Sequence, residues 1–182
     1  MSLRKRTDYI VIHTTATPEG KPFTVADITR MHKARGFQTI GYHYLIGLNG
    51  EIWPGRVPDN SVGAHVAGYN STTLGVSYVG GVDKNNKPKD TRTDGQRAAM
   101  LTLIRKLLIK YPKAMILGHR DLSPDKNHDG VVTPNEWIKQ CPCFSARTWA
   151  RENGLPAALG EPGIKVAVTA DVRAFPAGTI VL

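Results

Sequence analysis

Two apolar runs of strand length, each ending at a histidine, constrain the fold of this chain more than any other feature. Residues 8–13 read DYIVIH and residues 114–119 read AMILGH. Short apolar runs of this kind are typical of strands buried within a sheet. Between them, apolar residues recur with helical spacing at 24–35, behind Thr24 as a plausible N-cap, and at 93–111. Strands that alternate with helices predict an α/β (α+β) fold with a central mixed β-sheet flanked by helices.

The remaining expected elements are shorter. They are strands at 41–48, 51–54 and 74–81, a hairpin turn at Asn49-Gly50, and a last helix from Ser145 to about Asn153. The length of the chain fits one compact domain, which we place at residues 1–155. Prolines punctuate short β-type runs in residues 156–182, and we expect this extension to pack on the domain as short strands.

Charge and cysteine content narrow the class of protein. The 24 lysines and arginines against 15 acidic residues give a formal net charge of +9, which favours an anionic partner such as nucleic acid, a membrane surface or the bacterial cell wall. The N-terminal apolar run is too short for a signal peptide or a membrane span, so we expect a protein made in the cytoplasm without membrane insertion. We also expect it to be a monomer. Cys141 and Cys143 lie one residue apart, where a mutual disulfide would be strained, so a thiolate ligand is the better interpretation.

His13 and His119 are placed where a metal site could form. Functional groups in α/β sheets gather beyond the carboxyl ends of strands, and both histidines close a strand. Zinc binds imidazole nitrogen and thiolate sulfur, and a catalytic site uses three protein ligands, so Cys141 is the natural third ligand. Spacing alone leaves open that the histidines are hydrogen-bonded core residues and that Cys141 is a small buried apolar residue.

Six short motifs occur in a fixed order along the chain. They are HTTAT (13–17), GYHYLI (41–46), VGAHVAGYN (62–70), LGVSYVGG (74–81), GHRD (118–121) and KQCPCF (139–144). Over about residues 7–153 this set resembles the phage lysozyme-type N-acetylmuramoyl-L-alanine amidases, which share a fold with peptidoglycan recognition proteins. The resemblance implies zinc ligands at His13, His119 and Cys141.

The same resemblance implies roles for other residues. Tyr42 and Lys139 match the catalytic tyrosine and lysine of the family, and Cys143 is left as a packing residue. His65 and Asn70 lie in a glycine-rich loop that, by resemblance, faces the substrate cleft, so we expect them to contact substrate. His43 follows Tyr42 on a strand and therefore points to the opposite face, as a buried structural residue or as a hydrogen-bond partner of a metal ligand.

The implied reaction is cleavage of the amide between the lactyl group of N-acetylmuramic acid and L-alanine of the stem peptide. Zinc would lower the pKa of a bound water to about 7 and polarise the carbonyl. Lys139 would face the developing negative charge, and Tyr42 would orient the water or share the oxyanion. We expect a phage endolysin that acts on the cell wall after release from the host cytoplasm. The alternatives are a non-catalytic peptidoglycan-recognition module and a nucleic-acid or polymerase-binding regulator, although no nucleic-acid motif is present and no nucleic-acid partner is expected.

An acidic insert at 125–136, DKNHDGVVTPNE, matches the pattern of a calcium-binding loop. Its predicted oxygen ligands are Asp125, Asn127, Asp129, the Val131 carbonyl, Thr133 and Glu136. Pro124 argues against an incoming helix, so a full EF-hand is not expected. Thr133 and Glu136 also form a capping box that needs no metal, which leaves a capped polar turn as the alternative to a structural calcium ion.

Overall fold

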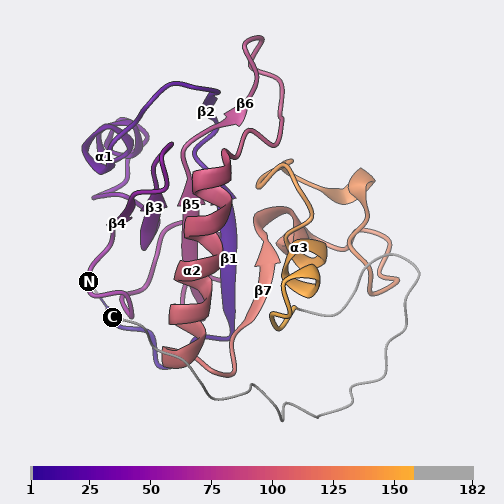
Figure 1. Cartoon of the computed structure of the whole chain (residues 1–182). Helices are drawn as coiled ribbons and strands as arrows, with labels where there is room; N and C mark the ends of the chain where they lie inside the picture. The colour runs from indigo at the N-terminus through magenta and orange to yellow at the C-terminus, as the bar shows by residue number, and fades with distance from the viewer. Residues whose placement is uncertain (1, 158–182) are drawn as a thin grey trace.

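The computed structural model describes residues 2–157, in which a five-stranded sheet is flanked by helices and accompanied by a small two-stranded sheet (Figure 1). The elements in chain order are β1 (Tyr9–Thr14), β2 (Thr17–Pro18), α1 (Val25–Lys33), β3 (Tyr44–Ile46), β4 (Ile52–Pro54), β5 (Thr73–Tyr78), β6 (Gly81–Val82), α2 (Asp94–Lys110), β7 (Met115–Gly118), η1 (His119–Leu122), η2 (Pro134–Glu136) and α3 (Ala146–Glu152). The predicted α/β architecture is confirmed. The pairing of β2 with β6 was not anticipated, because two-residue strands leave no periodic signal.

The strand order of the large sheet is β4-β3-β5-β1-β7. Strands β3, β5, β1 and β7 run parallel, whereas β4 pairs antiparallel with β3 across the predicted hairpin. β1 lies between β5 and β7 in the middle of the sheet. The chain leaves β1 towards β3 on one side and later reaches β7 on the other, so connections diverge at the carboxyl end of β1.

The two faces of the sheet have different partners. Ile10 and Ile12 of β1 belong to the larger core, together with residues of α2 and α3. In Figure 1, α2 crosses one face of the sheet and α3 lies beside β7. Strand alternation places Val11 and His13 on the other face. Leu45 on this second face packs in a separate core with Ile28 of α1. The candidate site therefore lies on the second face.

The long helix α2 begins at the capping box of Thr93 and Gln96, in which each side chain accepts a hydrogen bond from the other residue's backbone N–H. Its buried apolar residues are Met100, Leu103, Ile104 and Leu107, with the i, i+3, i+4, i+7 spacing of one helical face. Leu101 and Leu108 are only half-buried, at the edges of that face. None of the helices described within residues 2–157 is long and apolar enough to cross a membrane.

The end of the described chain touches the sheet. Ala157 forms a parallel bridge with Ile116 of β7. The strands expected within the C-terminal extension fall at residues 158–182, which lie outside the described residues, so their packing stays a prediction.

Candidate metal centre and active site

His13 and His119 meet because β1 and β7 are paired in parallel. Ile12 lies opposite Gly118 in the register, so the next residue of each chain segment is one of the two histidines. Their ring centroids are 4.7 Å apart, and their side chains are buried, with exposures of 1% and 8%. Sheet register thus places two imidazoles, 106 positions apart in sequence (119 minus 13), at the same level.

Cys141 reaches the histidines from the loop that follows η2. The Arg120 N–H donates to the Cys141 carbonyl at 2.8 Å, and the Thr14 N–H points to Cys141 Sγ at 3.3 Å. Cys141 Sγ lies 3.7 Å from His13 Nδ1, close to the roughly 3.6 Å expected of sulfur and nitrogen ligands that share a tetrahedral zinc ion. Donor atoms of His13, His119 and Cys141 all lie within 4.8 Å of one another. Their number, type and spacing fit zinc.

The protonation of this cluster suits a cation. Burial lowers the pKa of His13 well below its usual value, with neighbouring histidines and Lys139 adding to the effect. Burial and the Lys139 charge lower the pKa of His119 to about 4, so both imidazoles are neutral and offer lone pairs. Burial raises the pKa of the Cys141 thiol to about 12. Zinc binding would therefore expel the thiol proton, which makes zinc affinity rise with pH.

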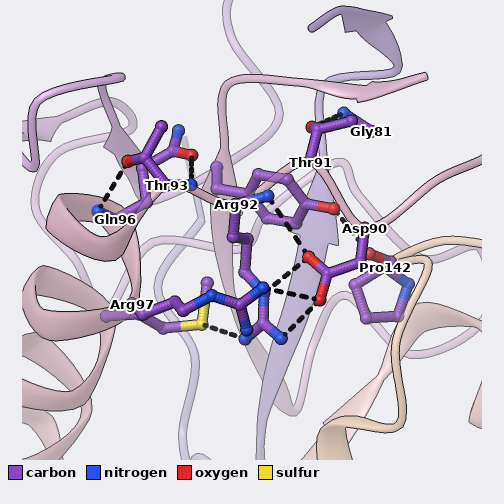
Figure 2. A network of polar contacts seen from close by, with 10 residues as sticks. Gly81, Asp90, Thr91, Arg92, Thr93, Gln96, Arg97 and Pro142 are labelled. Carbon is purple, nitrogen blue, oxygen red and sulfur yellow. Dashed lines mark hydrogen bonds and ion pairs between the residues drawn. The ribbon is translucent and has the colours of Figure 1, made fainter. Parts of the chain in front are cut away.

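The segment that carries Cys141 is fastened to the sheet from behind. Tyr78 O–H donates to the Pro142 carbonyl at 2.8 Å, and the Arg92 guanidinium carbon lies 3.1 Å from the centroid of the Phe144 ring. Figure 2 shows that Asp90 accepts hydrogen bonds from Arg92, the residue that stacks on Phe144, and from Arg97. These contacts hold the cysteine loop against β5, so the third ligand comes from an anchored segment.

Tyr42 and Lys139 line the same pocket as His119 and Cys141. The His13 and Tyr42 rings lie 5.2 Å apart between centroids, and the Tyr42 hydroxyl points to the Thr14 carbonyl at 3.5 Å. Burial raises the pKa of Tyr42 above its usual value, so its hydroxyl keeps its proton. Lys139 is exposed at the pocket, near enough to His119 to lower its pKa.

His65 also borders the pocket, but its ring faces inward. It is 9% exposed, its Nδ1 lies 2.9 Å from His13 Nε2, and its Nε2 lies 3.4 Å from the Thr73 carbonyl. Both ring nitrogens thus have protein partners, and the substrate contact expected from the sequence stays a prediction. Asn70 is not among the residues that line this pocket, because its Oδ1 accepts from the His65 and Val66 N–H groups.

Cys143 packs away from the donor atoms as expected, and His43 is buried as expected. The His43 ring does not point away from the site, however: it lies 5.5 Å from the His65 ring, because residues 42 and 43 precede β3 and do not follow its alternation. His43 is fully buried, and its Nδ1 accepts from the Gly75 N–H at 2.9 Å. Cys143 Sγ points to the Gly81 carbonyl at 3.3 Å, away from the cluster of donor atoms. Both residues therefore contribute packing and hydrogen bonds around the site.

A side chain of the acidic insert accepts hydrogen bonds from the insert's own backbone N–H groups. Glu136 Oε1 accepts from the N–H groups of Lys126 and Asn127, and Oε2 accepts from the N–H and hydroxyl of Thr133. These donors lower the pKa of Glu136 to about 2. The structure shows the capped polar turn that was the alternative to a calcium loop, preceded by a short 3-10 turn and no incoming α-helix.

The carboxylates among the six predicted calcium ligands do not form a group of converging metal-type donors. Asp125 Oδ2 accepts from the Gly130 N–H, and Asn127 Nδ2 donates to Asp129. Within residues 2–157, only His13, His119 and Cys141 form a group of three such side chains with converging donor atoms. Asp125 Oδ1 is buried without a hydrogen-bond partner, the one feature of the loop that a cation would satisfy. Calcium binding through these residues and the Val131 carbonyl thus lacks support in the geometry and stays a prediction.

Several residues that line the pocket, among them Thr14, Arg35 and Phe37, had no role predicted from the sequence. Thr14 aims its backbone N–H at Cys141, while Arg35 and Phe37 border the pocket just beyond α1. A backbone donor has no side-chain signature, and a helix end becomes a pocket wall only once the chain is folded. The HTTAT motif, which contains Thr14, was the available signal for the first of these.

Comparison with known proteins decides the family. The sequence profile of the N-acetylmuramoyl-L-alanine amidases (Amidase_2) matches residues 3–136, well over half of the chain. This chain belongs to that family. The amidase is 34% identical to the endolysin of Klebsiella phage KP32 and 32% identical to that of Escherichia phage T7, each over 152 residues that cover 84% of this chain and 91% of the phage protein. It is therefore a peptidoglycan hydrolase.

Solved structures agree with this assignment. The amidase LysC from Clostridium intestinale superposes with a TM-score of 0.62 at 26% identity, covering 82% of this chain and 86% of LysC. The endolysin of the Thermus scotoductus phage Ph2119 gives a TM-score of 0.62 at 28% identity, covering 84% and 88%. Bumblebee PGRP-SA, at 22% identity and a TM-score of 0.65 over 88% and 90%, shares the fold. The profile match ends before Lys139 and Cys141, so the support for Cys141 as the third candidate ligand is its geometry beside His13 and His119.

Proposed function

We propose that this amidase is a zinc-dependent endolysin that hydrolyses the amide between the lactyl group of N-acetylmuramic acid and L-alanine. The observation that carries the proposal is the convergence of neutral His13 and His119 with Cys141 beside a pocket. A zinc ion held by these three side chains would supply an activated water and polarise the scissile carbonyl. We infer further that the protein acts on the cell wall as a monomer.

Lys139 and Tyr42 supply charge and hydrogen bonding around the reacting carbonyl. Lys139 borders the pocket beside His119, so its ammonium faces the place where an amide oxygen gains negative charge. Tyr42 keeps its proton because its pKa is raised, and it acts as a hydrogen-bond donor to the attacking water or the oxyanion, not as the base. Arg35 and Lys139 make the pocket positive, which favours an anionic peptide stem.

The alternative is a recognition module that binds peptidoglycan without cleaving it, as the fold shared with PGRP-SA allows. The convergence of Cys141, Tyr42 and Lys139 on one pocket favours hydrolysis, since binding alone needs no cluster of metal-type donors.

The test uses purified peptidoglycan incubated with the protein, with and without a zinc-selective chelator. Release of new N-terminal L-alanine that stops on chelation and returns with added zinc is expected. Release that survives chelation would contradict the zinc proposal, and new reducing sugar ends would point to glycan cleavage. Binding to the sediment without release would establish the recognition module instead.

A further inference from the structure

The His65 ring lies directly behind His13, on the side away from Cys141. His13 Nδ1 faces Cys141 Sγ at 3.7 Å, and His13 Nε2 faces His65 Nδ1 at 2.9 Å. The two rings meet edge to face, with centroids 5.0 Å apart and planes at 89°. A histidine that ligates a metal with one nitrogen usually donates the N–H of the other to a partner that fixes its orientation. His65 stands in the place of that partner.

The surroundings of His65 decide which nitrogen carries the proton. Its Nε2 faces the carbonyl oxygen and the Oγ1 of Thr73, each at 3.4 Å. The Thr73 hydroxyl donates its own proton to the Tyr69 carbonyl at 2.9 Å, so both neighbours of Nε2 accept. The proton of a neutral His65 therefore belongs on Nε2, and its Nδ1 accepts. His13 must then donate from Nε2, which leaves the lone pair of its Nδ1 facing Cys141.

Two glycines of the surrounding backbone leave the space that the His65 ring fills. A Cβ on Gly75 of β5 would lie 2.8 Å from His65 Nδ1, and a Cβ on Gly63 would lie 2.5 Å from His65 Cδ2. Two glycines thus form a slot that the imidazole fills. Asn70 fixes the loop from the other side, since its Oδ1 accepts from the His65 N–H at 2.8 Å.

We propose that His65 is a positioning residue that holds His13 in the tautomer and orientation needed to bind zinc. Hydrogen bonds run from His13 Nε2–H to His65 Nδ1, and from His65 Nε2–H to the two oxygens of Thr73. The role rests on the zinc site proposed above, and it replaces the substrate contact expected for His65. Asn70 becomes a support of the same loop.

Zinc affinity is the first readout, measured by competition with a chromophoric chelator at one pH. His65→Ala is expected to bind zinc about 10-fold to 100-fold more weakly than wild type. His65→Asn keeps an acceptor oxygen near the place of Nδ1 and should stay within a few-fold of wild type. Gly75→Ala should behave like His65→Ala, because its methyl group displaces the ring. His128→Ala, an exposed histidine of the acidic insert, is the matched control.

Each outcome bears on the proposal. Equal zinc affinity of wild type and a folded His65→Ala would overturn it, as would a raised KM for peptidoglycan with unchanged zinc affinity, the mark of a substrate contact. In zinc-free wild type, nitrogen-15 NMR should show Nε2–H tautomers for both His13 and His65, and an Nδ1–H on either would also overturn it. A wild-type protein that binds no zinc would instead refute the proposed function, and this inference with it.

Discussion

The metal centre and the acidic insert both contain side chains that can bind metal ions, but their donor atoms are arranged in different ways. His13, His119 and Cys141 come from β1, η1 and a distant loop, and their donor atoms converge within 4.8 Å. The insert holds its candidate ligands in twelve consecutive residues, 125–136. Both carboxylate oxygens of Glu136 nevertheless accept hydrogen bonds from nearby backbone N–H groups.

The contrast shows what gathers ligands in this protein. Parallel pairing of β1 with β7 fixes the positions of the two histidines independently of the loops that follow them. Burial lowers their pKa values, so the imidazoles are neutral and can bind a metal. In the insert, the backbone N–H groups of a tight turn compete for the same oxygens that a cation would use. Strand pairing between distant residues assembles the metal centre. In the insert, hydrogen bonds from nearby backbone N–H groups engage oxygens that a cation would otherwise bind.

The largest effect should follow from removing the cysteine ligand. Cys141→Ser is expected to lose zinc and to reduce release of L-alanine from peptidoglycan by on the order of 1,000-fold or more, because the hydroxyl is a poor replacement for a thiolate. Asp129→Asn in the insert is the matched control and should keep both properties. Metal analysis and the release assay measure them, and full activity of Cys141→Ser would contradict the assignment.

Lys139 should have the next largest effect. Lys139→Ala is expected to lower kcat by about 100-fold to 1,000-fold with zinc content unchanged, since a charge at the developing oxyanion is lost. Lys126→Ala is the control, because Lys126 is an exposed lysine of the insert whose backbone N–H, not its ammonium, contacts Glu136. A Lys139→Ala enzyme within a few-fold of wild type would remove this residue from the mechanism.

The pH dependence of stability should separate the two regions. The folded pKa of His119 is about 4, below its unfolded value of 6.5, so its contribution is complete above pH 6.5 and is lost as the pH falls towards 4, by up to about 3 kcal/mol. The folded pKa of Glu136 is about 2, so its contribution is complete above pH 4.5 and is lost as the pH falls through 2. Urea unfolding of zinc-free protein measures both. His119→Asn should flatten the curve between pH 6.5 and 4, and an unchanged curve would contradict the assignment.

The smallest effect should come from the insert itself. Glu136→Gln is expected to lower the thermal midpoint by a few degrees and to leave kcat unchanged, because it weakens charge-assisted hydrogen bonds to backbone donors. Asn135→Ala, its exposed neighbour, should change neither. Added calcium should not shift the midpoint of wild type. A clear rise with calcium would show that the loop rearranges to bind the ion, as its sequence pattern predicts.

The sequence predicted the fold where periodicity and caps were strong. The strand runs at 8–13 and 114–119 and the helix caps at Thr24 and Ser145 all appear as expected, since each depends on residues close in sequence. The short pair β2 and β6 depends on contacts across 64 positions (81 minus 17) and carried no local signal.

For the site, chemistry was easier to predict than placement. The types of His13, His119 and Cys141 suggested zinc, and the family resemblance added Tyr42. The direction of the His65 ring could not be predicted, because it depends on contacts with Gly75 and Thr73 of β5, which form only in the folded chain. For the insert, the motif is complete in sequence, but both carboxylate oxygens of Glu136 accept hydrogen bonds from local donors, so calcium binding there stays a prediction.

X-ray absorption spectroscopy at the zinc edge of the loaded protein tests the central claim most directly. A site at His13, His119 and Cys141 predicts a zinc shell with one sulfur at about 2.3 Å and nitrogens at about 2.0–2.1 Å, with the sulfur lost in Cys141→Ser. A shell of oxygen atoms alone, unchanged in Cys141→Ser and lost in Asp129→Asn, would place the metal in the insert and contradict the account.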